Sequence, residues 1–178
     1  MKKALNLGCG PVYFESNADI EWENSDLADT ESSRSWKVDK KRDFAQPFDD
    51  LFDNSVDIIV AWHIIEHVGL HENGSIVREW ARVLKPGGRL YIACPNVREI
   101  ARRIVNGTPP WNDPYICMVN LYGPYNGFEG DYHKWGFFPE SLCKLLTDNG
   151  FSDAREMNMS PFGELGFADY NIQIEGIK

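Results

Sequence analysis

The near-continuous apolar run at residues 56–62 constrains the fold of this chain more than any other feature. The run is rich in β-branched residues and lacks polar alternation, which is typical of a strand covered on both faces. A second run of this kind, at residues 90–94, ends at Pro95. Strands buried on both faces occur mainly in parallel sheets, so the two runs indicate an α/β fold.

Helical patterns alternate with the strand patterns. Apolar residues recur every three or four positions, which predicts amphipathic helices at residues 76–84, 97–105 and 139–146. Glycine-containing turns end these patterns at residues 85–88, Gly107 and Gly150. Shorter strand patterns occupy residues 4–7, 22–26 and 35–39 and lie around 155–159 and 168–174. This alternation predicts a parallel sheet with right-handed crossovers, in one domain over residues 1–178.

Residues 108–135 interrupt the alternation. The segment is rich in aromatic residues and glycines, but no helix or strand pattern is evident in it. A segment of this length inside a compact domain is usually functional or disordered, and the aromatic residues argue against disorder. We therefore expect a lid or an acceptor-binding insertion, in which the aromatic side chains form either the core of the lid or a platform for the substrate.

Charge and composition exclude several classes of protein. The net charge of −9 argues against a nucleic-acid backbone as the main partner. No apolar run approaches the ~20 residues of a membrane span, and the apolar part of the N-terminus is too short for a signal peptide, so we expect a cytoplasmic protein without membrane contact. The four cysteines lie far apart with no CxxC pair, which fits a reducing compartment and provides no metal framework.

A glycine turn follows the first predicted strand and suggests a ligand site. In open α/β sheets, ligands bind beyond the carboxyl ends of the strands. Gly8 and Gly10 allow close approach to the main chain, and their amides could bind a carboxylate. Asp26, at the predicted end of the second strand, could accept hydrogen bonds from both hydroxyls of a ribose. A plain tight turn and an ordinary surface acid are the structural alternatives.

Several segments, taken in order, resemble the class I S-adenosylmethionine-dependent methyltransferases, and in particular their small methyltransferase-11-like branch. They are residues 5–10, 22–26, 53–57, 63–67 and 82–88, and the likeness continues through His133 to residue 151. Residues 82–88 form the most specific of these motifs. The resemblance implies a Rossmann-like, doubly wound sheet of seven strands, mostly parallel with the last strand antiparallel.

The resemblance also implies S-adenosyl-L-methionine as cofactor and S-adenosyl-L-homocysteine as product. By this likeness the turn formed by Gly8, Cys9 and Gly10 would hold the methionine moiety, and Asp26 would hold the ribose. Asn6 stands where the family usually has an acid, which leaves one contact to the methionine amine in question.

Two further parts of the cofactor site follow from the same likeness. The acid after the third strand would contact the adenine; Asp43, with Phe44 beside it, is our first choice and Asp39 the alternative. Trp62 and His63, directly after the fourth strand, would flank the transferred methyl group.

Histidines provide the candidates for proton transfer. His63 could take a proton from an acceptor hydroxyl or amine, and His133 in the insertion is a rival for this role. Positioning by hydrogen bonds is the alternative for both. His63, His67 and His71 recur every four residues, as zinc ligands on a helix would, but Gly69 interrupts the run, so we expect no metal.

The function predicted from the sequence is methyl transfer to an oxygen or nitrogen acceptor, a small molecule or a sugar. The alternative is a catalytically weak methyltransferase-fold subunit that acts through a partner protein, motivated by Asn6 and by the absence of a helix before the first strand. A homodimer is also compatible with the sequence. An NAD-dependent oxidoreductase is disfavoured because Tyr13 occupies the place of the third glycine of the dinucleotide-binding motif.

Overall fold

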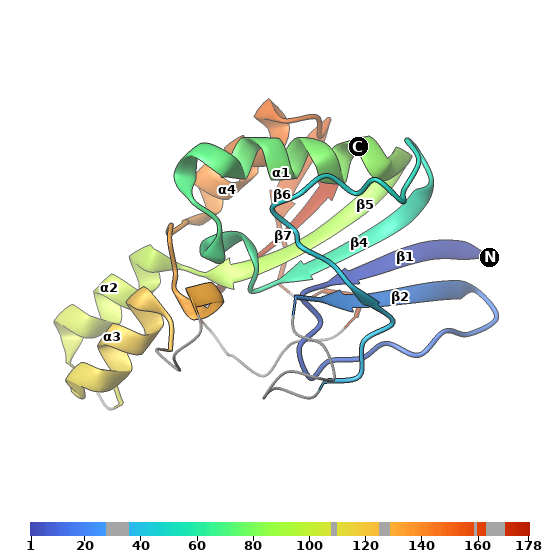
Figure 1. Cartoon of the computed structure of the whole chain (residues 1–178). Helices are drawn as coiled ribbons and strands as arrows, with labels where there is room; N and C mark the ends of the chain where they lie inside the picture. The colour runs from blue at the N-terminus through green and yellow to red at the C-terminus, as the bar shows by residue number, and fades with distance from the viewer. Residues whose placement is uncertain (28–35, 108–109, 125–128, 159, 163–169) are drawn as a thin grey trace.

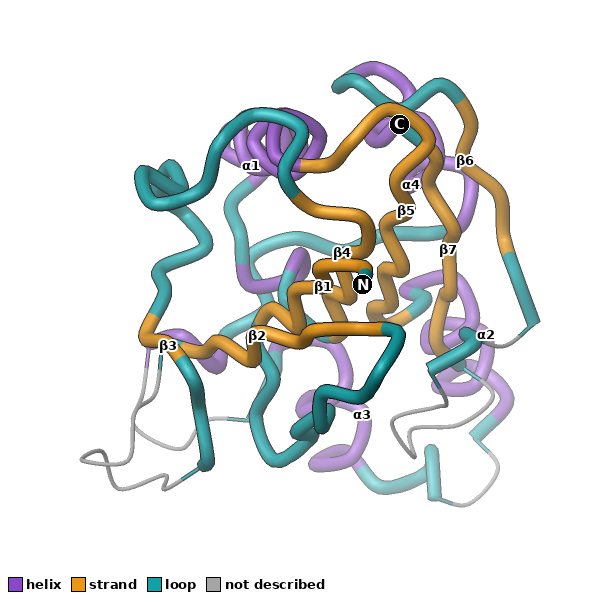
Figure 2. Tube along the Cα trace, turned by 90° about the vertical axis from the view of Figure 1, so that its right-hand side faces the viewer, coloured by secondary structure: helices purple, strands orange, loops and turns teal. Residues whose placement is uncertain are grey.

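The computed structural model describes residues 1–27, 36–107, 110–124, 129–158, 160–162 and 170–178. Its centre is a seven-stranded sheet with the order β3-β2-β1-β4-β5-β7-β6 (Figure 2). The strands are β1 (Lys2–Leu7), β2 (Ile20–Asp26), β3 (Lys40–Lys41), β4 (Val56–Trp62), β5 (Leu84–Pro95), β6 (Asp153–Glu156) and β7 (Asn171–Ile177).

Strand directions match the predicted topology. The pairs β1–β2, β1–β4, β2–β3 and β4–β5 are parallel, whereas β7 runs antiparallel to both β5 and β6. The prediction of a mostly parallel sheet with its last strand antiparallel is therefore confirmed. As a consequence, the carboxyl ends of β1, β2 and β4 meet at one edge of the sheet.

Helices cover one face of the sheet. Helices α1 (Leu70–Val83) and α4 (Pro139–Asp148) lie together on that side (Figure 1). Alternate strand residues such as Leu5, Ile59 and Ile92 point into a core that also holds the fully buried Trp80 of α1. The helices α2 (Val97–Asn106) and α3 (Pro114–Tyr122) instead lie beyond the end of β5, where Trp111 packs with Ile100 and Cys117.

Loop residues cover the opposite face. There, Val60 and other strand residues of the opposite parity pack against Phe14 and Phe162. Phe14 belongs to the connection between β1 and β2, which forms no helix and lies on the side of the sheet opposite α1 (Figure 2). The absence of a helix after Gly10 agrees with the sequence, which shows no helical period there.

Four predicted segments differ from the structure. The third strand was predicted at 35–39, but β3 is formed by Lys40–Lys41. The strand predicted around 155–159 is β6, at Asp153–Glu156; residues 35 and 159 lie outside the described residues. The turn at 85–88 lies within β5, because the chain passes directly from α1 into that strand. The insertion contains α3 and the short 3-10 helix η2 (Glu129–Asp131).

The strand predicted at 168–174 is β7, which begins at Asn171; residues 168 and 169 lie outside the described residues. None of the helices in the described part of the chain is long and apolar enough to cross a membrane.

Candidate functional site

The glycine bend and Asp26 lie next to each other at the carboxyl ends of β1 and β2. Leu7 pairs with Ser25 in the parallel ladder, so the residues that follow these two emerge side by side. The amide of Gly10 donates a hydrogen bond of 2.8 Å to Oδ2 of Asp26, and the amide of Cys9 donates one of 3.0 Å to the carbonyl of Ser25. The bend and the acid thus form one unit, as a site for an amino acid joined to a sugar requires.

Two buried asparagines hold the loop that follows the bend. The Nδ2 group of Asn6 donates to the carbonyl of Val12 (2.8 Å) and to Oδ1 of Asn24 (3.0 Å). The amide of Asn24 bonds both main-chain groups of Phe14, at 2.9 and 3.0 Å. The side-chain amide of Asn24 therefore bonds Phe14 as the backbone of a neighbouring strand would. Together, Asn6 and Asn24 order a loop that contains no helix.

A cavity of about 210 Å³ opens beside the bend. Five of the residues predicted from the sequence as site residues, or considered among them, line it: Gly8, Gly10, Asp26, Phe44 and His63. The remaining lining comes from Leu27, Trp36, Ile64, His67, Gly130 and Asp131, of which Trp36, Ile64 and Asp131 had no signal in the sequence that marked them as site residues.

The other predicted cofactor residues do not line this cavity. Asn6 is buried beneath the loop, and Cys9 is buried with its thiol 4.0 Å from the carbonyl of Lys37. Burial, together with the charges of Asp26 and Asp39, raises the pKa of Cys9 to about 12, so this thiol is protonated at neutral pH.

The side chains of Asp43 and Trp62 make other contacts and do not line the cavity. Asp43 is exposed, and its carboxylate accepts a hydrogen bond of 2.9 Å from the amide of Ala45. Trp62 has the strand parity of Val60, so its ring packs against Phe14 on the loop-covered face, with ring centroids 5.7 Å apart. Asp39, the alternative to Asp43, bonds the hydroxyl of Tyr13 and the main chain of Asn24.

His63 is held by both ring nitrogens. It follows β4 directly with a left-handed backbone (φ 54°), a conformation that non-glycine residues adopt mainly where the surroundings enforce it. Nδ1 lies 3.1 Å from Oε1 of Glu66, and Nε2 lies 3.2 Å from Nδ2 of Asn171. A carboxylate only accepts hydrogen bonds, so Nδ1 carries the proton and Nε2 accepts from the amide of Asn171.

Glu66 is buried, but its pKa lies below the ordinary value. Burial raises the pKa of Glu66, and the hydrogen bond from His63, together with the electrostatic effect of the neighbouring imidazoles, lowers it by more. Its side chain is 2% exposed. In the sequence, Glu66 stands between His63 and His67, but no pattern there marks it as the buried partner of His63.

A second cavity, of about 300 Å³, adjoins the first. The two share His63, His67 and Asp131, so these three residues stand between them. The other residues around the second cavity are Glu66, Pro95, Val119, Asn120, Pro124, His133 and Tyr170. Its volume is at the lower end of ligand pockets, which fits a small molecule.

The insertion is fixed over this region by main-chain bonds. The carbonyl of Glu66 accepts from the amides of Lys134 (2.7 Å) and Trp135 (3.1 Å). The amide of His133 donates to the carbonyl of Tyr122, at 2.9 Å. These bonds bring His133 to the residues that follow β4, a proximity that the sequence spacing alone could not reveal.

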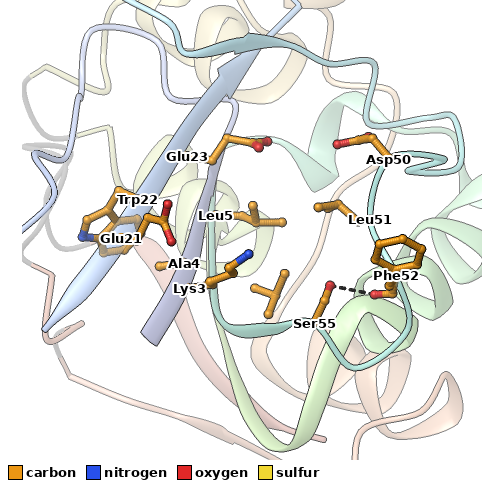
Figure 3. Close-up of a pocket in the computed structure, with 11 residues that line it drawn as sticks. Lys3, Ala4, Leu5, Glu21, Trp22, Glu23, Asp50, Leu51, Phe52 and Ser55 are labelled. Carbon is orange, nitrogen blue, oxygen red and sulfur yellow. Dashed lines mark hydrogen bonds between the residues drawn. The ribbon is translucent and has the colours of Figure 1, made fainter. Parts of the chain in front are cut away.

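A further cavity lies at the opposite end of β1 and β2, where these strands begin (Figure 3). Glu23 and Asp50 line it, but both carboxylates are paired with Arg42, at 2.5 and 2.8 Å. Parallel sheets bind ligands at the carboxyl ends of their strands, so we assign no function to this cavity.

Comparisons with known proteins concern the family and the fold. Residues 5–92 match a family model described as a methyltransferase domain, of the methyltransferase-11 type. No curated protein sequence matches the chain.

Solved structures share the fold. The chain is similar to an S-adenosylmethionine-dependent methyltransferase from Archaeoglobus fulgidus, with a TM-score of 0.62 and 16% identity over 99% of this chain and 86% of that one. It is similar to the CurJ carbon methyltransferase (TM-score 0.61, 13% identity, 99% of this chain and 48% of that one). It also matches a chain from the Haloferax volcanii complex of the Trm112 methyltransferase activator with a methyltransferase candidate (TM-score 0.57, 14% identity, 99% and 82%).

Proposed function

We propose that this chain is a class I S-adenosylmethionine-dependent methyltransferase that methylates an oxygen or nitrogen of a small-molecule acceptor. Two findings support the proposal: residues 5–92 match the methyltransferase domain, and the whole chain has the corresponding fold. The observation that carries the proposal is the pair of adjoining cavities, which share His63, His67 and Asp131. The cavity beside the glycine bend would hold the cofactor, and the neighbouring cavity would hold the acceptor.

The residues of the first cavity suit the parts of the cofactor. Asp26 would accept hydrogen bonds from the ribose hydroxyls, and the backbone of the bend, which already bonds Asp26 through the Gly10 amide, would meet the methionine moiety. The rings of Phe44 and Trp36 lie in the same lining and would stabilise a sulfonium cation by cation–π attraction.

The reaction is an in-line displacement. A lone pair of the acceptor attacks the methyl carbon while the carbon–sulfur bond breaks, and the bond electrons remain on sulfur in the neutral thioether S-adenosyl-L-homocysteine. The acceptor loses its proton to a base or to solvent. The main contribution of the protein is to hold acceptor atom, methyl carbon and sulfur in line, with the acceptor atom ~3–3.5 Å from the methyl carbon. Two cavities that share lining residues favour this arrangement.

His63 is our candidate for the proton acceptor. Glu66 orients the ring and would stabilise its charged form, and Nε2 becomes available when the amide of Asn171 is displaced by the acceptor. His133 lines the acceptor cavity and is the second candidate.

Calorimetry with S-adenosyl-L-homocysteine tests the cofactor site. Asp26→Asn keeps an acceptor for the Gly10 amide but removes the charge, so we expect affinity about tenfold below that of the parent, since bonds to charged groups are stronger by about this amount. The control is Asp19→Asn, which changes an exposed acid just before β2 and should bind as the parent does. A parent protein that does not bind the ligand at millimolar concentration, or equal affinity for parent and Asp26→Asn, would contradict the proposal.

A partner-dependent subunit is the second candidate function. It is favoured by the similarity to a chain that is solved together with a methyltransferase activator. Purified chain that turns over a methyl donor as a monomer would exclude it, whereas cofactor binding without turnover until a partner is added would support it.

A further inference from the structure

The carboxylate of Glu66 and the imidazoles of His67 and His133 converge in the acceptor cavity. One ligand atom from each residue lies within 4.8 Å of those of the other two, and the three residues all line that cavity. The rings of His67 and His133 are nearly perpendicular, with centroids 5.1 Å apart. Donors around a tetrahedral ion lie roughly 3.4 Å apart, so side-chain shifts of about 1 Å would close the group around one.

Glu66 contributes an oxygen that no described group satisfies. Oε1 accepts the hydrogen bond from His63, whereas Oε2 is buried with no hydrogen-bond partner among the described residues. A buried carboxylate oxygen without a partner is unfavourable, and a cation is a partner that such an atom readily takes.

His67 has the tautomer of a metal ligand. Nδ1 lies 3.1 Å from the carbonyl oxygen of Tyr132. A carbonyl only accepts, so Nδ1 carries the proton and Nε2 keeps its lone pair. Histidines that bind metals commonly have this arrangement, because a backbone carbonyl fixes both the tautomer and the orientation of the ring.

His133 completes the group from the insertion. Its imidazole lines the acceptor cavity together with Glu66 and His67. One carboxylate with two imidazoles is a donor set that suits zinc and divalent iron, and three protein ligands leave a position open.

We propose that Glu66, His67 and His133 bind a divalent transition-metal ion of the zinc and iron class, whose open position takes an oxygen of the acceptor. His133 then serves as a ligand, and His63 remains the candidate base. The acceptor part of this inference rests on the proposed function; the ion site does not. The sequence predicted no metal because it showed only the run of His63, His67 and His71, whereas the third ligand comes from the insertion.

Titration of the metal-free chain tests the ion site directly. Protein without an affinity tag is treated with a chelator, transferred to chelator-free buffer and titrated with Co²⁺ by visible absorption and with Zn²⁺ by calorimetry, without methyl donor or acceptor. We expect one ion per chain, with affinity reduced on the order of 100-fold in His133→Ala, because even outer-shell changes weaken metal binding 10–100-fold. His71→Ala is the matched control, since this exposed histidine of α1 lies outside the group, and it should keep the affinity of the parent.

Three outcomes would overturn the ion site: no stoichiometric binding by the parent, equal affinity in parent and His133→Ala, or an equal loss in His71→Ala. If His133→Ala does not fold, the imidazole NMR signals of the parent protein test the ion site instead. Zn²⁺ should shift the signals of His67 and His133 but not the signal of His71, and unshifted signals of His67 and His133 would overturn the site. Because the titration contains no cofactor, a negative result would overturn the ion site without bearing on the binding of S-adenosyl-L-homocysteine.

A small oxygen ligand tests the open position. Acetohydroxamate, added to the Co²⁺ form, should change the visible spectrum by occupying the free coordination sites. An unchanged spectrum would overturn the acceptor part of the inference.

Discussion

Glycine is required at both position 8 and position 10 of the bend after β1, but for different physical reasons. Both have positive φ, 60° and 48°. A Cβ on Gly8 would lie 2.7 Å from Cγ1 of the buried Ile64, whereas a Cβ on Gly10 would meet nothing within 4 Å. Gly8 is thus fixed by backbone conformation and by packing together, and Gly10 by its backbone alone.

The pair of variants Gly8→Ala and Gly10→Ala separates the two effects. Each substitution places an alanine in the left-handed region, which costs roughly 1–2 kcal/mol. Gly8→Ala must also displace Ile64, and overpacking of this kind costs roughly 1–3 kcal/mol more. Urea denaturation should therefore show a larger loss of free energy of unfolding for Gly8→Ala than for Gly10→Ala; equal losses would contradict the packing argument.

Residues of the site differ in how far the sequence could predict them. The proximity of Gly8 and Gly10 to Asp26 was predictable, because parallel pairing of two adjacent strands brings their ends together. The proximity of His67 to His133 depends on a bond from His67 to Tyr132, 65 positions away, and on the main-chain bonds of Glu66. Such contacts have no local signal.

The edge of the sheet shows how side chains set the bounds of an element. The carboxylate of Asp39 accepts the amide of Asn24 at 2.8 Å, a bond that a carbonyl of a longer third strand would otherwise make. The main chain of Asp39 still donates to the carbonyl of Asn24, at 2.8 Å, but the paired residues of β3 begin only with Lys40, opposite Ser25. The strand was predicted at 35–39 from the sequence, which contains no signal for a side chain that takes the place of a backbone group.

The bonds of Asp39 predict a pH dependence of stability. Burial raises the pKa of Asp39, but bonds from Tyr13 and Asn24, with the charge of Lys37, hold it below the ordinary value. A depressed pKa stabilises the fold above the unfolded-state value, near ~3.9, and this contribution is lost as the pH falls through the folded-state value. Urea denaturation between pH 7 and pH 3 should thus show Asp39→Asn less stable than the parent at pH 7, with the difference shrinking toward pH 3. If the free energies of unfolding of the two proteins change in parallel with pH, Asp39 does not have this role. The effects of the other carboxylates are the same in both proteins and cancel in the comparison.

Helix α3 shows what a compositional argument misses. The segment 108–135 was predicted as a lid from its aromatic residues, and no helix was expected in it. The local start signal was present, since Asp113 caps the helix by accepting from the amide of Tyr115 at 2.8 Å and Pro114 occupies the first turn. Its apolar residues do not form one stripe, so the periodicity that identified α1 and α2 gave no pattern here.

At the scale of the whole molecule, the two faces of the sheet are covered by different means. Helices α1 and α4 bury one face, whereas single aromatic side chains from loops cover the other. Phe162 contacts Trp22 and Tyr91 edge-on, with ring centroids 5.1 and 5.4 Å apart, and also lies 6.0 Å from Phe14. One ring thus joins β2, β5 and the loop after the glycine bend.

Phe162→Ala tests whether this ring holds the loop-covered face together. Loss of a fully buried phenylalanine costs roughly 3–5 kcal/mol, and because Phe162 is only half-buried we expect about 2 kcal/mol. The control is Phe52→Ala, whose side chain is 84% exposed and whose removal should change stability by no more than about 0.5 kcal/mol. Because Phe14 belongs to the loop that Asn6 and Asn24 order, Phe162→Ala should also weaken S-adenosyl-L-homocysteine binding, while Phe52→Ala should not. Equal stability of the two variants would mean that the strands, and not the loop aromatics, maintain this face.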